Sequence, residues 1–143
     1  MTLQERRLVL LLRWWVGLFS GAAVVFAVFP DALIYWLNAI GRQVFQWPFQ
    51  LLPYPTERFW NVLAVSLLVV LIFSAIEALK DIRQNLAFVK LIVISKLATT
   101  IGFLLAAILH GPFFAYIAGM AIDFIILLLT WFCYRKTVVS RGL

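Results

Sequence analysis

The sequence predicts an all-α integral membrane protein: a bundle of four transmembrane helices with an interfacial or re-entrant segment between the first two. Hydrophobic residues make up 65% of its 143 residues and charged residues only 13%, whereas a soluble domain carries about a quarter charged residues. A chain of this size exposes too much surface to hide that apolar excess in one core. Four apolar runs of about 20 residues match the thickness of a bilayer. We therefore expect residues 1–143 to form a single membrane domain.

The first apolar run predicts a membrane span over residues 8–29. It ends before Pro30, which cannot continue a helix without disrupting it. The run is too long for a secretory signal peptide, and no small-residue cleavage site follows it. We therefore expect this segment to stay in the membrane as the first helix.

Residues 31–57 connect the first two spans and are unusually apolar for a loop. Asp31 is expected to cap a short helix over residues 32–40, which Gly41 would end. The rest of the segment is too apolar for solvent and too short to cross the bilayer. Two interpretations stay open, a helix lying in the interface plane and a shallow re-entrant piece packed among the spans. The Trp and Tyr content favours the interface.

Three further spans are predicted at residues 59–79, 86–109 and 113–134. A short charged loop joins the second span to the third. The third and fourth are joined by a tight turn around Gly111, where glycine and proline interrupt the helical pattern. The third and fourth spans should therefore be antiparallel neighbours.

Basic residues predict the orientation, because cytoplasmic loops of membrane proteins are enriched in Lys and Arg. Nine of these residues lie on one side of the predicted membrane and two on the other. The nine are Arg6, Arg7, Arg13, Lys80, Arg83, Lys90, Arg135, Lys136 and Arg141, and the two are Arg42 and Arg58. We therefore expect both termini to be cytoplasmic, and we expect the host membrane to be a bacterial inner membrane.

Two charged residues, Lys96 and Asp123, lie deep within predicted spans. Each is about ten residues into its helix, which at about 1.5 Å per residue is near mid-membrane. A charge at that depth is costly and marks a functional candidate. Counted from Gly111, their levels differ by about 4.5 Å, which a lysine side chain can bridge. We predict an ion pair facing the bundle interior, either a structural pair that fixes helix register or part of an ion- or proton-coupled site.

A second ion pair is possible near the inner interface, between Arg13 in the first span and Glu77 in the second. Their levels in the membrane are similar. Alternatively, Arg13 reaches lipid phosphates with its long side chain, and Glu77 pairs with Lys80 or Arg83. The sequence leaves both interpretations open.

Small residues form stripes at helical spacing on three of the spans. Such residues let helix backbones approach closely in lipid, where apolar side chains gain nothing by leaving the hydrocarbon. The candidate packing positions are Gly17 and Gly21 in the first span, Ser95, Thr99, Gly102 and Ala106 in the third, and Ala115 and Gly119 in the fourth.

The sequence contains no Walker loop, dinucleotide fingerprint, nucleophile elbow, HExxH or CxxC motif. We therefore expect no catalytic residue, cofactor or metal in this chain. The basic residues flank apolar runs, as topology signals and lipid contacts do, which argues against nucleic-acid binding.

Three functions remain open, and the lipid bilayer is a partner in each of them. The first is a non-enzymatic accessory or structural subunit that acts by helix packing with itself or with a larger membrane complex. The second is a small oligomeric transporter or channel that uses Lys96 and Asp123. The third is a lipid- or quinone-binding membrane protein.

Overall fold

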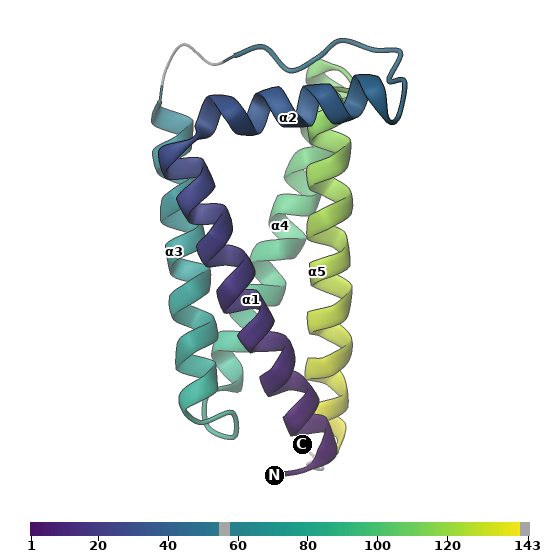
Figure 1. Cartoon of the computed structure of the whole chain (residues 1–143). Helices are drawn as coiled ribbons and strands as arrows, with labels where there is room; N and C mark the ends of the chain where they lie inside the picture. Colours follow the sequence, from purple (N-terminus) through teal and green to yellow (C-terminus); the bar gives the residue numbers. More distant parts are fainter. Residues whose placement is uncertain (55–57, 141–143) are drawn as a thin grey trace.

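The computed structural model describes residues 1–54 and 58–140, and these residues form an all-helical bundle (Figure 1). The five helices within them are α1 (Leu3–Val28), α2 (Pro30–Gln43), α3 (Phe59–Lys80), α4 (Leu86–His110) and α5 (Phe114–Val139). All except α2 are long and apolar enough to cross a membrane. The predicted integral membrane bundle of four spanning helices is thus confirmed.

The N-terminus, Ser140 and the loop between α3 and α4 lie at one end of the bundle, which we call the inner end (Figure 1). Helix α2 crosses the opposite end, which we call the outer end. The start of the chain and the end of the last helix thus lie at the same end of the described bundle (Figure 1), while residues 141–143, with Arg141, are outside the described residues.

Helix α1 begins before the predicted span, because the polar residues at its start form a cap. The hydroxyl of Thr2 accepts a hydrogen bond from the backbone N–H of Glu5 at 3.2 Å. The Glu5 carboxylate accepts one from the backbone N–H of Thr2 at 2.7 Å, which completes a capping box. At the other end of the chain, α5 continues past Arg135 to Val139. A hydropathy run marks the part of a helix in lipid, whereas capping decides where the helix begins.

The segment after the first span forms α2, a helix of 14 residues. Pro30 occupies its first position, where the missing N–H removes no helical hydrogen bond. The expected cap at Asp31 is wrong: this residue lies within the first turn, and the preceding Phe29 makes no side-chain capping bond. Gly41 does not end the helix either, since α2 runs on to Gln43. The Asp31 carboxylate bonds instead to Arg58, the residue before α3.

Helix α2 is held against the outer end of α5. A Cβ atom added to Gly41 would lie 2.8 Å from Cγ of Phe114, so this glycine allows the two helices to touch. The chain after α2 is fixed by Trp47, whose Nε1 donates to the Pro112 carbonyl at 2.9 Å. Helix α2 thus lies across the ends of the spanning helices rather than between them (Figure 1).

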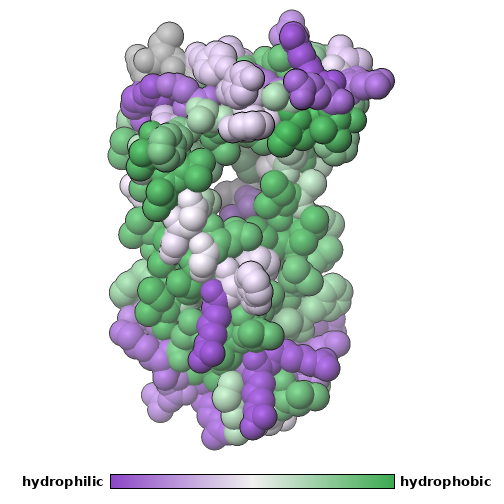
Figure 2. All heavy atoms as spheres, in the orientation of Figure 1, coloured by the Kyte–Doolittle hydropathy of each residue, from purple (hydrophilic) through white to green (hydrophobic). Residues whose placement is uncertain are grey.

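The apolar core occupies only the inner half of the bundle. Helix α1 packs chiefly on α3, and α4 on α5. The core consists of Leu8, Leu12, Trp15, Phe19, Leu71, Ala75, Ala78, Ile82, Val89, Ile92 and Ile126. Beyond Phe19, Leu71 and Lys96 towards the outer end, the described residues of α1, α3 and α4 include no buried side chain. Figure 2 shows a hollow between the apolar side chains at this level, below α2.

Candidate functional site at the centre of the bundle

The structure brings Lys96 and Asp123 together at the centre of the bundle. Lys96 Nζ lies 2.7 Å from Asp123 Oδ1, and the two residues are only 7% and 9% exposed. They meet because α4 and α5 are antiparallel neighbours joined at Gly111, whose φ of 101° suits glycine. The short turn fixes the stagger of the helices, and the lysine side chain covers the remaining distance.

Helix α1 covers this ion pair with aromatic rings. Lys96 Nζ lies 5.1 Å from the centre of the Phe19 ring, within the range of a cation–π attraction. The Phe19 ring in turn stacks on Trp15, with centroids 6.1 Å apart and planes inclined by 21°. The lysine charge is therefore held between a carboxylate and an aromatic face, away from lipid.

A buried hydrogen bond also joins α1 to α5. Trp15 Nε1 donates to Thr130 Oγ1 at 2.9 Å, and Thr130 Oγ1 donates to the Ile126 carbonyl at 2.7 Å. Thr130 is fully buried, so both of its bonds are made where water does not compete. This contact was not predicted from the sequence, because only charged and small residues were considered as candidates within the spans. The spacing of Trp15 with Leu8 and Leu12 would have placed it on the buried face.

Two hydroxyls one turn after Lys96 on α4 are satisfied within their own helix. Thr99 and Thr100 both donate to the backbone carbonyl of Lys96, at 3.2 Å and 2.7 Å. Such bonds to the preceding turn leave a hydroxyl little reason to seek a partner on another helix. The ion pair itself thus brings two opposite charges together within 2.7 Å in a buried position between α4 and α5.

The second candidate pair, Arg13 and Glu77, does not form. Glu77 Oε1 lies 2.6 Å from Lys80 Nζ one turn further along α3, which is the alternative partner that the sequence allowed. Arg13 is exposed on α1. It lies one turn before Gly17 and about 1.4 turns after Leu8, a rotation of about 140° that carries it away from the buried face of α1. Counting residues along the spans places Arg13 and Glu77 at a similar depth in the membrane, but it does not predict which face of α1 carries Arg13.

The small-residue positions divide into packed and unpacked ones. Gly119 lies in the contact between α4 and α5, since a Cβ added there would be 2.8 Å from the Phe103 ring. At Gly17, Gly21 and Gly102, an added Cβ would meet nothing within 4 Å. Gly102, a candidate packing position, therefore has no close neighbour in the described chain, and the ring that reaches Gly119 is that of the adjacent Phe103.

The remaining small-residue positions give no comparable contact. Ser95, Thr99, Ala106 and Ala115 are half-buried. Their packing role remains a prediction, because exposure alone does not identify the helix that covers them.

An exposed ion pair at the outer end joins α2 to α3 and was not predicted. Arg58 donates to both oxygens of Asp31, with Nη1–Oδ1 at 2.8 Å and Nη2–Oδ2 at 2.7 Å. These hydrogen bonds and the guanidinium charge hold the pKa of Asp31 below its ordinary value. They raise the pKa of Arg58. The sequence signal that could have predicted this pair is the opposite charges of Asp31, just after the first span, and Arg58, just before the second.

A second unpredicted contact ties the start of α1 to the loop between α3 and α4. The Glu5 carboxylate is 2% exposed, and its Oε1 lies 3.5 Å from Arg83 Nε. The amino group of Met1 lies 3.9 Å from Glu5 Oε2. Glu5 thus contributes both to the helix cap and to the assembly of the inner end.

Comparison with known proteins gives no relative: no family model, curated protein or solved structure matches this chain. The described residues define its class as an integral membrane protein with four spanning helices and a buried ion pair at their centre.

Proposed function

We propose that the protein is a non-enzymatic membrane subunit that packs its helices against a second copy of itself or a larger membrane complex. The observation that carries this proposal is the outward face of α1. Gly17 and Gly21 lie on that face, opposite the buried side chains, and no atom of the described chain would contact a Cβ at either position. Glycines four residues apart allow another helix to approach closely in lipid. No helix in the described part of the chain lies close against either glycine.

The half-packed bundle supports the same proposal. In the apolar stretch of each spanning helix, only 17% to 22% of the residues are buried. The apolar core stops near the level of Phe19 and Leu71. A helix from a partner would cover apolar surface that the chain itself leaves bare. Lys96 and Asp123 then have a structural role, because they hold α4 and α5 in register. Helix α1 keeps its outward face free for the partner helix.

We also propose how the protein lies in its membrane. The inner end carries most of the basic residues and would face the cytoplasm, in a bacterial inner membrane. Tyr35 and Trp36 on α2 are 57% and 62% exposed, and rings of this kind prefer the interface between lipid and water. Helix α2 would therefore lie in the interface of the opposite leaflet.

A paired substitution tests the proposed packing. We would extract the tagged protein in native nanodiscs and measure complex masses by native mass spectrometry. The wild type should give protein assemblies heavier than the 16.4 kDa protomer. Leucines at both Gly17 and Gly21 should release the protomer, because they block close approach of a helix. Gly102→Leu is the matched control, since this glycine is also exposed within a span. A lone wild-type protomer would contradict the proposal.

Transport is a second candidate, favoured by the position of the ion pair. Lys96 and Asp123 lie where the packed core ends, and Figure 2 shows a hollow between apolar side chains below α2. A proton path through the pair predicts that Asp123→Asn abolishes proton flux into liposomes, measured with an entrapped pH dye. Asp81→Asn is the control, because Asp81 lies in the loop after α3. Flux that is absent from the wild type, or equal in both variants, would exclude this candidate.

A further inference from the structure

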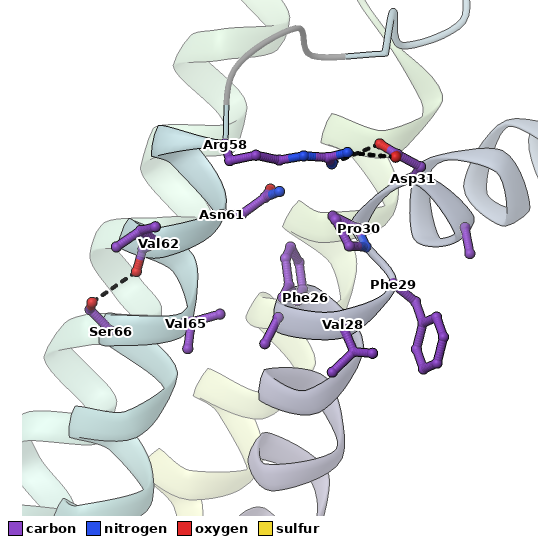
Figure 3. Close-up of a pocket in the computed structure, with 12 residues that line it drawn as sticks. Phe26, Val28, Phe29, Pro30, Asp31, Arg58, Asn61, Val62, Val65 and Ser66 are labelled. Atoms are coloured by element: carbon purple, nitrogen blue, oxygen red, sulfur yellow. Dashed lines mark hydrogen bonds and ion pairs between the residues drawn. The ribbon is translucent and has the colours of Figure 1, made fainter.

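A pocket lies at the outer end of the bundle, between the end of α1, the start of α2 and the start of α3 (Figure 3). Its volume is about 670 Å³. Phe26 of α1 and Val62 and Val65 of α3 supply apolar walls. The pair formed by Asp31 and Arg58 closes its outer edge.

One polar group in this pocket has no partner. Among the residues that the structure describes, the buried side-chain amide nitrogen of Asn61 makes no hydrogen bond. In Figure 3, Asn61 projects from α3 into the space below the Arg58–Asp31 pair. A buried donor left unpaired is costly, so its position in a pocket points to an acceptor supplied from outside the chain. The other hydroxyl in the lining, Ser66, already donates to the Val62 carbonyl at 2.8 Å.

The order of these groups along α3 matches the order of groups in a membrane lipid. Arg58 and Asp31 lie at the rim, and Asn61 is three residues further in, or about 4.5 Å along the helix. Val65 is a further turn down, at about 6 Å from Asn61. A glycerolipid has the same sequence of a polar head, ester carbonyls just below it, and acyl chains in the hydrocarbon.

We propose that this pocket binds a glycerolipid from the leaflet on the α2 side. One ester carbonyl of the lipid accepts a hydrogen bond from Asn61 Nδ2. Its acyl chain lies along Phe26, Val62 and Val65, and its head group lies beside the Arg58–Asp31 pair. The lipid thereby fills the space between the outer ends of α1 and α3 and satisfies the unpaired donor. This binding concerns the outer end of α1, whereas the proposed helix packing is centred on Gly17 and Gly21.

A competition between two lipids tests this assignment. The full chain in detergent is given equal amounts of dioleoyl phosphatidylglycerol and its diether analogue, which has the same head and chain length but no ester carbonyl. Native mass spectrometry then counts the retained molecules of each. The wild type should retain the ester lipid about three- to tenfold more, as expected for one net hydrogen bond.

Two variants identify the residue responsible for the preference. Asn61→Leu should reduce the ester-to-ether ratio to about one, because leucine keeps the volume and removes the donor. Ser66→Ala should keep the wild-type ratio, because that hydroxyl is already bonded within α3. Equal retention of the two lipids by the wild type overturns the proposal, and this result needs no variant to fold. A preference that persists in Asn61→Leu, or retention of a quinone in place of a glycerolipid, also overturns it.

Discussion

Replacing Lys96 with methionine would remove one partner of the buried ion pair while keeping most of the side-chain volume. Asp123 would then keep its carboxylate in the bundle interior, where it is 9% exposed, without the ammonium group 2.7 Å away. Breaking a buried pair in this way typically costs about 3–5 kcal/mol. The loss of the cation–π contact with Phe19 adds about 0.5–2 kcal/mol. We therefore expect Lys96→Met to lower the free energy of unfolding by at least about 3 kcal/mol.

The reverse change, Asp123→Leu, leaves the lysine unpaired and should cost a similar amount. The double variant has neither charge, and replacing a whole buried pair with apolar residues is often neutral. Its free energy of unfolding should therefore lie within about 1 kcal/mol of the wild type, with non-additivity of at least about 3 kcal/mol.

The assay is reversible unfolding in mixed micelles, with SDS as the denaturant and far-UV circular dichroism as the signal. Lys90→Met is the matched control, because Lys90 is an exposed lysine on the same helix. It should change the free energy by no more than about 0.5 kcal/mol. Single variants that each cost less than about 0.5 kcal/mol, with an additive double variant, would refute the structural role of the pair.

Two further predictions concern the neighbouring contacts. Trp15→Phe removes the donor to Thr130 and should lower the free energy of unfolding by about 0.5–1.5 kcal/mol. The control Trp14→Phe, at a position that is 70% exposed, should change this free energy little. Equal effects of the two variants in the same SDS assay would contradict the buried bond. The pKa of Asp31 is lowered from 3.8 by its hydrogen bonds with Arg58, so the pair is fully formed above pH 3.8 and is lost as the pH falls through the lowered pKa. An NMR titration of the Asp31 carboxyl should show its midpoint below 3.8, and Arg58→Gln should move it back up; a midpoint at or above 3.8 in the wild type would be inconsistent with the pair.

The spans were predictable because bilayer thickness imposes a length on apolar runs that the sequence displays directly. The second and third spans begin at Phe59 and Leu86, as predicted. The ends of α1 and α5 differ, because Thr2 and Glu5 form a cap beyond the apolar run and α5 continues past its basic residues to Val139. Hydropathy predicts the length of helix that lies in lipid, but it does not predict the helical turns that extend beyond the lipid.

The central ion pair was predictable for a related reason. A tight turn at Gly111 fixes the stagger of α4 and α5, so simple counting places Lys96 and Asp123 at neighbouring levels. Counting residues from a turn does not predict how each helix is rotated about its axis, so contacts that depend on this rotation could not be predicted. Gly102 was a candidate packing position, but the ring that reaches Gly119 of α5 is that of its neighbour Phe103. Small residues at helical spacing define a face of a helix and do not predict which helix covers that face.

The outer end was the least predictable part of the chain. The pairing of Asp31 with Arg58 depends on the angle at which α2 leaves α1, and the chain between Pro30 and Arg58 does not encode that angle in any short motif. Aromatic content indicated an interfacial segment but could not give its contacts. The packing of Phe114 on Gly41, for example, joins residues on two helices that are far apart in the sequence.

The most direct test of the proposed packing is photo-crosslinking in the intact membrane. Val24 lies seven residues from Gly17 on the same face of α1 and is 57% exposed. A benzophenone amino acid at this position should form a crosslink to protein, either a second copy or another membrane protein. The same probe at Leu105 of α4, which is 51% exposed, should label mainly lipid. Protein adducts at Val24 alone would support a helix-packing subunit, and lipid adducts alone at both positions would contradict it.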